Sequence, residues 1–334
     1  MKLVYDPLYG DHLRDLGHPE SPDRVEVVVA RLAGRGLTGD MIAARDADDA
    51  EIERVHAHRY VELVKREIGD LSAPRYLSTG DVVVDGRTLD VARRAVGGAV
   101  TAMETAVAHD APAFALVRPP GHHAESSRGM GFCVFNNAAI AARAYLAHNG
   151  GRVLLIDFDY HHGNGSQDVV GDGLSYVSTH ASPAYPGTGH EIAERGGDAL
   201  INVPLPASGI ATEAFVAIWE ALLERAAAFV RPDLIVASAG FDYVSGDPVG
   251  DLGVDVSAAS SLTRAINRCA QQYCNGRVAY VLEGGYAIDA LAESIAQVIA
   301  CSDAGETQRN DARIESVPAA QRALLTAVDE RFRR

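Results

Sequence analysis

The chain has 334 residues, of which 47% are hydrophobic, and a formal net charge of -15. This length and composition allow one large core, so no second domain is required. The negative charge disfavours general binding to nucleic-acid phosphates and suits cationic substrates such as lysine-rich peptides or polyamines, although solubility explains it equally well. No apolar run approaches the length of a membrane span, so no membrane partner is expected.

Short apolar runs alternate with alanine-rich stretches along most of the chain. This alternation predicts an α/β fold in which helices cover a parallel sheet. The side chains of Asn136 and Asn137 are expected to cap a helix, and residues 69–90 are expected to form a long loop. The expected strands lie near 2–5, 113–118, 152–158, 174–179, 233–238 and 277–282, and the expected helices lie near 88–109, 136–148, 212–230, 256–275 and 287–300.

Two adjacent imidazoles, His122 and His123, follow the expected strand at 113–118. They lie on a loop shaped by Pro119, Pro120 and Gly121. A lone histidine is more often structural, but a tandem pair after a rigid turn suits proton transfer.

The next polar segment, residues 156–165, follows the apolar residues 153–155. Because alternate side chains of a strand share a face, Asp157, Asp159 and His161 are expected to project together. Buried charges of this kind need compensation, and a divalent cation usually supplies it. The alternative is an ordinary solvated turn rich in Asp, Asn, His and Gly.

Two later strands also end in polar groups. Asp242 follows the strand at 233–238, and Tyr286 follows the strand at 277–282 after two glycines. Because ligands bind at the carboxyl ends of strands in an open parallel sheet, these strand ends indicate one shared crevice.

The order of these motifs resembles the histone deacetylase family of the arginase-deacetylase fold, and the resemblance covers the chain up to about residue 300. It implies a single-domain, three-layer α/β architecture with a mainly parallel sheet of about eight strands and helices on both faces. The matching segments are Gly17 to Arg24, Arg118 to Ala124, Gly131 to Asn137, Asp157 to Gly165, Tyr185 to Gly189, Gly240 to Asp242, Gly246 to Pro248 and Leu282 to Tyr286.

Two positions resemble the class II branch of the family. Asn164 and Glu283 stand where class I members usually have Asp and Gly. The class II branch includes bacterial deacetylase-like amidohydrolases and acetylpolyamine amidohydrolases, so we favour the class II-like bacterial group.

The resemblance implies two cation sites. Asp159, His161 and Asp242 would hold a divalent metal, Zn²⁺ or alternatively Fe²⁺, in an open site with room for water and substrate. The backbone carbonyls of Asp157, Asp159 and His161, together with Ser178, would hold a structural K⁺, for which carbonyls and hydroxyls are suitable hard ligands.

The resemblance also assigns catalytic roles. His123 would act as general base and then acid, and His122 would give electrostatic support and help to position the water. Asp157 would hold the far nitrogen of His122, and Asn164 would hold that of His123. Tyr286 would donate a hydrogen bond to the developing oxyanion.

The substrate channel is expected around Phe132 and Tyr185, which resemble the two aromatic walls that enclose an acyl-lysine stem. Val249 occupies a rim position where a polyamine-selective relative carries Glu, and an apolar residue supplies no countercharge for a distal ammonium. Asp81 resembles a rim aspartate that grips substrate backbone amides, and Arg24 resembles an arginine in an inner cavity associated with acetate. Three glycines, Gly131, Gly284 and Gly285, are also assigned to substrate binding, the last two because they would let the Tyr286 loop move.

The favoured function is therefore a metal-dependent deacylase acting on N-acetyl-lysine in proteins or peptides, or on a small N-acylated amine. Two alternatives remain: an acetylpolyamine amidohydrolase, and a catalytically inert protein that binds acyl-lysine. Arginase-like hydrolysis is disfavoured because that branch uses additional aspartates for two metals.

Residues 1–301 are expected to form the catalytic domain, and residues 302–334 a polar linker and an amphipathic C-terminal helix. This helix would dock on its own domain or form a subunit contact in a homo-oligomer. Four cysteines without a Cys-x-x-Cys pair, and the lack of a signal-peptide pattern, favour a reducing cytoplasm.

Overall fold

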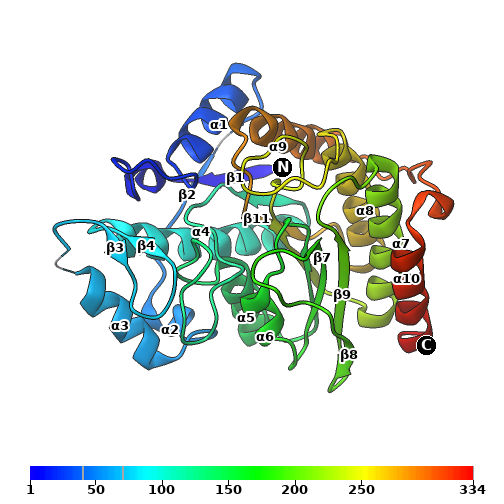
Figure 1. Cartoon of the computed structure of the whole chain (residues 1–334), viewed down its shortest axis with the longest axis horizontal. Coiled ribbons are helices and arrows are strands. Elements are labelled where there is room, and N and C mark those ends of the chain that lie inside the picture. Colours follow the sequence, from blue (N-terminus) through cyan, green and yellow to red (C-terminus); the bar gives the residue numbers. More distant parts are fainter. Residues whose placement is uncertain (40, 70, 334) are drawn as a thin grey trace.

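The computed structural model describes residues 1–39, 41–69 and 71–333. A nine-stranded sheet in the order β2-β1-β5-β11-β10-β6-β7-β9-β8 forms its centre (Figure 1). All neighbouring strands in it are parallel except β8 and β9. The strands are β1 (Lys2–Tyr5), β2 (Ile42–Ala43), β5 (Ala113–Ala115), β6 (Val153–Asp157), β7 (Leu174–Ser182), β8 (Ile192–Arg195), β9 (Asp198–Pro206), β10 (Leu234–Ala239) and β11 (Val278–Leu282).

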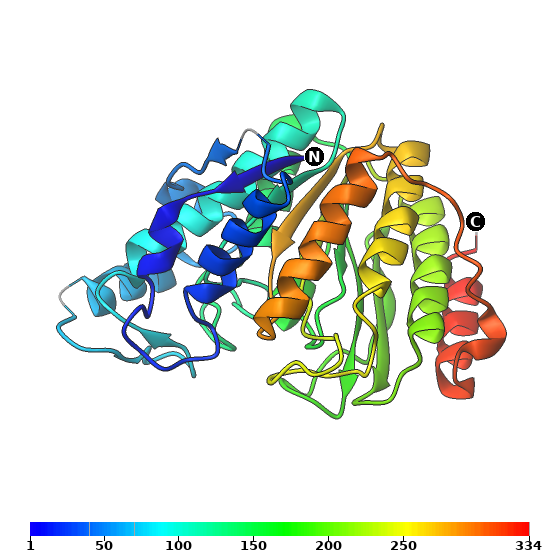
Figure 2. The same cartoon turned by 90° about the horizontal axis from the view of Figure 1, so that it is seen from above.

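Helices cover both faces of the sheet. On one face α1, α9, α8 and α7 lie side by side, as Figure 2 shows, and on the other face α4 and α5 pack against the strands. The predicted α/β fold is therefore confirmed. The helices are α1 (Asp23–Gly34), α2 (Asp49–Ile52), α3 (His58–Ile68), α4 (Thr88–His109), α5 (Asn137–Asn149), α6 (Asn164–Asp168), α7 (Thr212–Val230), α8 (Ala258–Tyr273), α9 (Ile288–Asp303) and α10 (Ala319–Arg331), with short 3₁₀ turns at Pro7–Asp11 and Ile314–Ser316.

The central strands are apolar on both sides because both faces of the sheet are covered. Every residue of β6, β10 and β11 is buried. Their register aligns their carboxyl ends, since Asp157 pairs with Ser238, and Ser238 pairs with Val281. The loops that follow these strands therefore open at one edge of the sheet.

The predicted cap of α5 is confirmed at Asn136 but not at Asn137, which is the first residue of the helix and donates to the carbonyl of Pro119 at 3.0 Å. The side chain of Asn136 accepts a hydrogen bond from the backbone N–H of Ala139 at 3.0 Å. An N-cap contact of this kind satisfies a helix donor that would otherwise lack a partner. It also fixes the start of α5 directly beside the tandem-histidine loop.

The expectation of a long loop over residues 69–90 holds for most of the described segment but misses a short hairpin and the start of a helix. β3 (Arg75–Tyr76) and β4 (Val83–Val84) form an antiparallel hairpin, and α4 already begins at Thr88. Strands of two residues are too short to give a sequence period, which is why the hairpin was not predicted. Residue 70 lies outside the described residues.

The C-terminal helix α10 lies against the outer side of α7 and contacts β9 (Figures 1 and 2). Phe332 and Phe229 pack edge to face with ring centroids 4.9 Å apart, and Gln321 donates a hydrogen bond to the carbonyl of Pro204 at 2.9 Å. This cover explains why α7 is buried on nearly all sides. Residue 334 lies outside the described residues, and the domain boundary at 301 stays a prediction.

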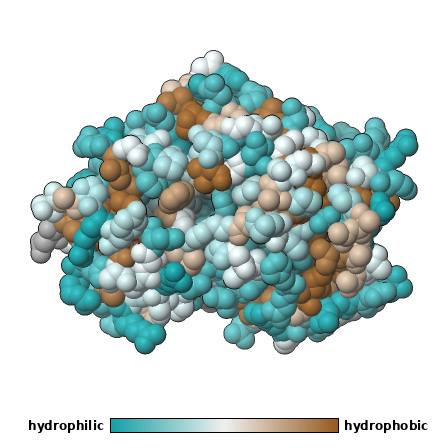
Figure 3. Space-filling model, in the orientation of Figure 1, coloured by the Kyte–Doolittle hydropathy of each residue, from teal (hydrophilic) through white to brown (hydrophobic). Residues whose placement is uncertain are grey.

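The surface agrees with the charged composition. Hydrophilic residues cover most of the face shown in Figure 3, and hydrophobic residues appear there in scattered groups. None of the helices in the described ranges combines the length and the apolar character that crossing a bilayer requires.

Candidate active site

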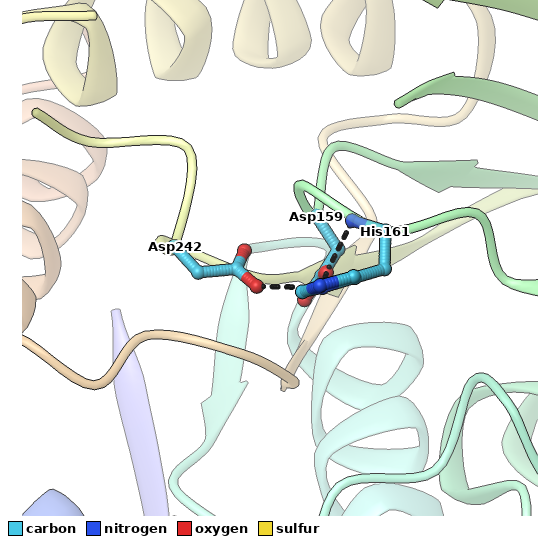
Figure 4. A group of neighbouring side chains, drawn as sticks. All are labelled: Asp159, His161 and Asp242. Atoms are coloured by element: carbon cyan, nitrogen blue, oxygen red, sulfur yellow. Dashed lines mark hydrogen bonds and ion pairs between the residues drawn. The ribbon is translucent and has the colours of Figure 1, made fainter. Parts of the chain in front are cut away.

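Three potential metal ligands meet at the edge where β6 and β10 end. Ligand atoms of Asp159, His161 and Asp242 all lie within 4.8 Å of one another. His161 Nδ1 is 3.2 Å from Asp159 Oδ1 and 3.0 Å from Asp242 Oδ2. Figure 4 shows the carboxylate of Asp242 pointing from its own loop towards the imidazole of His161.

The electrostatics of this cluster fit a divalent cation. Asp242 Oδ2 is buried, and apart from its ion-pair contact with His161 it has no hydrogen-bond donor among the described residues. Burial, together with the nearby charge of Asp159, raises the pKa of the Asp242 carboxyl to about 7. A bound cation would remove both penalties, because it coordinates Oδ2 and offsets the two neighbouring negative charges. Two carboxylates and one imidazole also suit an open catalytic site.

Asp157 does not belong to this cluster, which corrects one expectation. β6 ends at Asp157, so the alternation of a strand does not continue to Asp159 and His161. Asp157 Oδ2 instead lies 3.1 Å from His122 Nδ1 and accepts a hydrogen bond from the hydroxyl of Tyr176 at 2.9 Å. Asp242, from the loop that follows the neighbouring strand β10, completes the cluster in its place.

Backbone groups fix both carboxylates. Asp159 Oδ2 accepts a hydrogen bond from the N–H of Gly284 at 2.8 Å, and Asp242 Oδ1 accepts one from the N–H of Tyr160 at 2.8 Å. A Cβ atom on Gly284 would lie 2.6 Å from Asp159 Oδ2 and equally close to Asp242 Oδ2. Glycine is therefore required at 284 for the backbone to approach the cluster this closely.

His122 is held in its charged form. Burial alone would lower its pKa, but the carboxylates of Asp159 and Asp157 outweigh burial and raise the pKa of His122 to about 10. Its Nε2 lies 3.8 Å from Asp159 Oδ1, so the ring spans the space between the two acids. The two carboxylates therefore favour the protonated form of this imidazole.

His123 has the opposite environment. Burial, with His122 and His161 nearby, holds the pKa of His123 well below its usual value. Its Nδ1 lies 2.9 Å from Asn164 Oδ1, while Asn164 Nδ2 donates to Glu125 Oε1 at 2.8 Å. Because the amide nitrogen faces Glu125, the amide oxygen faces His123 and favours a proton on Nδ1. Nε2 of the neutral ring is then free to accept a proton.

Tyr286 lines the same cavity as the two histidines. Burial raises the pKa of its hydroxyl well above the usual value, which keeps the group a hydrogen-bond donor at neutral pH. The guanidinium carbon of Arg24 lies 4.7 Å from the centre of the Tyr286 ring, and Phe132 packs against the same ring edge to face at 5.9 Å. These two contacts fix the orientation of the ring.

A cavity of about 350 Å³ leads to these groups. Phe132 and Tyr185 form part of its wall, and the ring of Tyr185 meets that of His123 edge to face at 5.1 Å. Such a cavity has apolar walls and a few convergent polar groups, as small-molecule sites usually do. It is lined by Asp81, Pro120, His122, His123, Gly131, Phe132, Asp159, His161, Tyr185, Val249, Gly284 and Tyr286.

Comparison with known proteins identifies the family. Residues 18–301 match the histone deacetylase domain. The chain belongs to the histone deacetylase family. It is 33% identical over 326 residues to histone deacetylase 15 of Arabidopsis thaliana, covering 93% of this chain and 57% of that protein. It is 31% identical over 297 residues to a probable deacetylase of Archaeoglobus fulgidus, covering 86% of this chain and 81% of that one.

A solved structure agrees with this assignment. The crystal structure of the HDA15 HD domain superimposes with a TM-score of 0.86 at 29% identity, covering 98% of this chain and 94% of that chain. The predicted family and fold are confirmed, and family membership supports a hydrolase of the deacetylase kind. These relatives, from a plant and an archaeon, give no support to the bacterial group favoured from the sequence.

Two further residues that were expected at the substrate channel, Asp81 and Arg24, differ in their distance from the cavity. Asp81 lies at the rim, where its Oδ2 accepts a hydrogen bond from the hydroxyl of Tyr185 at 3.0 Å and its Oδ1 accepts one from the N–H of Gly131 at 2.9 Å. Arg24 is buried behind Tyr286 and is not among the residues that line the cavity in the described ranges. It donates to the carbonyl of Gly285 at 2.7 Å, so its expected link with acetate stays a prediction.

Two of the expected K⁺ ligands, Asp157 and Ser178, are neighbours in the sheet. Ser178 of β7 is the register partner of Asp157 on β6, and its hydroxyl lies 2.9 Å from His180 Nδ1. Ser178 is fully buried. K⁺ itself stays a prediction.

Several supporting residues were missed by the sequence reasoning. Tyr176 and Glu125 orient Asp157 and Asn164 from positions that carry no local motif. Glu283 was noted only as a class II feature, yet its Oε2 accepts hydrogen bonds from the N–H groups of Gly121, at 2.6 Å, and His122, at 3.1 Å. This carboxylate therefore anchors the tandem-histidine loop. Its place in the motif before the paired glycines was the available signal.

Proposed function

We propose that this chain is a metal-dependent deacylase that hydrolyses the amide of N-acetyl-lysine in a protein or peptide, or of a small N-acylated amine. One observation carries the proposal: a neutral His123 and a charged His122 adjoin a three-ligand cluster at the inner end of a cavity of about 350 Å³. Two titratable groups of one kind whose environments drive their pKa values apart are typical of divided acid and base roles.

The proposed metal ligands are Asp159, His161 and Asp242, with Zn²⁺ as the expected ion and Fe²⁺ as the alternative. When bound, such an ion would polarise the amide carbonyl and lower the pKa of a water molecule. K⁺ is proposed at the carbonyls of Asp157, Asp159 and His161 with the hydroxyl of Ser178.

His123 is the proposed general base. Its free Nε2 takes a proton from the attacking water and later gives it to the leaving amine. Asn164 keeps the other proton on Nδ1, as its oxygen lies 2.9 Å from that atom. His122, paired with Asp157, keeps its positive charge and stabilises the negative charge that develops beside it.

Tyr286 is the proposed oxyanion donor. Its protonated hydroxyl donates to the carbonyl oxygen as negative charge builds up there, a contact that is stronger in the transition state than in the bound substrate. Its raised pKa supports this role, because a donor that ionised at working pH would repel the developing charge.

The cavity walls support an acyl-lysine substrate. Phe132 and Tyr185 offer aromatic surface to a methylene stem, and Val249 at the rim offers no countercharge to a second ammonium. Acetyl-lysine therefore ranks above acetylpolyamines.

The decisive experiment is a turnover panel with protein loaded separately with Zn²⁺ and Fe²⁺. Substrates would be acetyl-lysine peptides, longer acyl-lysine peptides, acetylputrescine and acetylspermidine, with the Asp242→Ala protein as the blank. Faster turnover of acetyl-lysine peptides supports the proposal, and faster turnover of acetylpolyamines overturns the ranking. Tight peptide binding without turnover under every metal would identify an inert acyl-lysine-binding protein.

A further inference from the structure

Asp247 is a buried carboxylate to which the proposed mechanism gives no part. It lies in the loop between β10 and α8, and its exposed fraction is 7%. Its two oxygens accept four hydrogen bonds, and all four donors are backbone N–H groups from two different loops. A buried carboxylate is costly without partners, and four donors fill its acceptor capacity.

The donors divide between the two oxygens. Oδ2 accepts from the N–H of Tyr286 at 2.6 Å and from that of Ala287 at 2.9 Å. Oδ1 accepts from the N–H of Val249 at 2.9 Å and from that of Gly250 at 3.1 Å. One side chain thus joins the backbone of the proposed oxyanion donor to the backbone of the channel rim.

The two glycines before Tyr286 restrict the backbone little, so contacts with other segments must set its position. Gly284 and Gly285 precede it, and Gly285 has φ 120°, a conformation that only glycine adopts readily. Arg24 and Phe132 contact the Tyr286 ring, and Arg24 also donates to the carbonyl of Gly285 at 2.7 Å, but neither is a partner of the Tyr286 N–H. Hydrogen bonds with a charged group are roughly twice as strong as neutral ones, so Asp247 and Arg24 are both strong restraints on this segment. Of the two, Asp247 is the one that accepts from the N–H groups of Tyr286 and Ala287.

We infer that Asp247 is a positioning residue, which sets the place of the Tyr286 hydroxyl and couples it to the rim at Val249. The inference rests on the proposed function, since it assumes that Tyr286 is the oxyanion donor. The channel rim at Val249 and the hydroxyl of Tyr286 should therefore move together, so a substrate that displaces Val249 also displaces the hydroxyl.

Asp247→Asn tests the inference, because the amide nitrogen that replaces one oxygen would face two N–H donors and could accept from neither. Asp251→Asn is the matched control. Asp251 lies in the same loop and accepts from the N–H groups of Gly246, at 3.0 Å, and Gly253, at 2.8 Å, without touching the Tyr286 segment. A general loosening of the loop would affect both variants.

The kinetic test is a double-mutant cycle with Tyr286→Phe. We expect Tyr286→Phe to lower kcat about 100-fold and Asp247→Asn to lower it about 10-fold or more, through misplacement of the hydroxyl. In the Tyr286→Phe background, Asp247→Asn should change kcat by less than about 3-fold, because its target is already gone. Asp251→Asn should leave kcat near the wild-type value. Equal losses in both backgrounds would overturn the inference.

A second measurement does not depend on activity. Backbone hydrogen exchange over residues 284–290 should speed up in Asp247→Asn and stay at the wild-type rate in Asp251→Asn. Unchanged exchange in Asp247→Asn would overturn the inference, whether or not the protein has deacylase activity. If the wild type is inactive but exchange is faster in Asp247→Asn, the contact with Asp247 holds and only the proposed function is refuted.

If Asp247→Asn does not fold, Ala287→Pro tests the same contact from the other side. Ala287 has φ -79°, within the range of proline, so the change removes one N–H donor and leaves Asp247 and its rim contacts in place. The same non-additivity with Tyr286→Phe is expected, and additive losses would again refute the inference.

Discussion

Two buried clusters of charged side chains lie close together in this molecule, and they differ in how their charges are matched. In the first, Glu20 is paired with Arg24 and Arg118, and all three are fully buried. In the second, the two carboxylates of Asp159 and Asp242 share one imidazole, that of His161. The first cluster is complete without any ligand, whereas the second is short of positive charge.

The completeness of the first cluster is visible in its contacts. Arg118 Nε and Nη2 donate to the two oxygens of Glu20 at 2.7 and 2.8 Å, and Nη1 donates to the carbonyl of Tyr9 at 2.6 Å. Burial alone would raise the pKa of Glu20, but Arg118 outweighs it and lowers the pKa to about 2. In the other cluster burial prevails and the pKa of Asp242 rises to about 7. A buried carboxylate in this protein therefore indicates a functional site only where nearby positive charges do not balance it, as at Asp242.

The largest expected effect follows from removing a ligand of the unmatched cluster. Asp242→Ala should abolish metal binding and turnover, a loss beyond the roughly 10–100-fold that removing an outer-shell partner costs. Metal content after dialysis and turnover of an acetyl-lysine peptide would measure it, with Asp251→Asn as the control. Full metal content in Asp242→Ala would show that Asp242 is not a metal ligand and that the second cluster does not need a cation.

A stability loss follows from breaking the matched cluster. Arg118→Met removes the partner that bonds both oxygens of the buried Glu20 and leaves Arg24 as its arginine partner, which should lower the free energy of unfolding by about 3–5 kcal/mol. Arg309→Met, at an ion pair whose side chains are 70% and 68% exposed, is the control. It should change stability by less than about 1 kcal/mol. Urea unfolding measures both, and similar small losses would show that Glu20 does not depend on Arg118.

The cluster around Glu20 also predicts how the free energy of unfolding depends on pH. Because the pKa of Glu20 is lowered in the folded state, from 4.5 to about 2, its contribution is complete above pH 4.5. This contribution is lost as the pH falls from there towards 2. Unfolding free energies between pH 6 and 2.5 should therefore fall more steeply in the wild type than in Glu20→Gln. Parallel curves would contradict the lowered pKa.

How much of this the sequence predicted depends on the range of each interaction. Apolar runs located β6, β10 and β11 to within one residue, and the polar groups that follow them do meet at one edge. The pairing of Glu20 with Arg118 spans 98 residues and follows no period, so the local pattern did not predict it. The alternation argument failed at Asp157 because a strand's end is set by its partners in the sheet, which a single segment does not reveal.

An intermediate effect is expected at Asn164, a neutral side chain beside the unmatched cluster. Asn164→Ala removes the acceptor for His123 Nδ1 without changing the charge, so the imidazole can take the wrong tautomer. Turnover should fall about 10–100-fold with metal content unchanged. Asn164→Asp, which restores an acceptor, should recover most of the rate. Failure of that rescue would show that His123 does not depend on this hydrogen bond.

The smallest expected effect comes from placing a charge outside both clusters. Val249 lines the cavity at its rim and is partly exposed, so the carboxylate in Val249→Glu would be solvated and screened. A solvated pair with a distal ammonium contributes about 0.2–1 kcal/mol. The ratio of kcat/KM for acetylspermidine over an acetyl-lysine peptide should therefore rise by no more than about 5-fold, with Val249→Gln as the uncharged control. A much larger rise would mean that the rim is desolvated when substrate binds, and that a charge placed there acts as it does in the buried clusters.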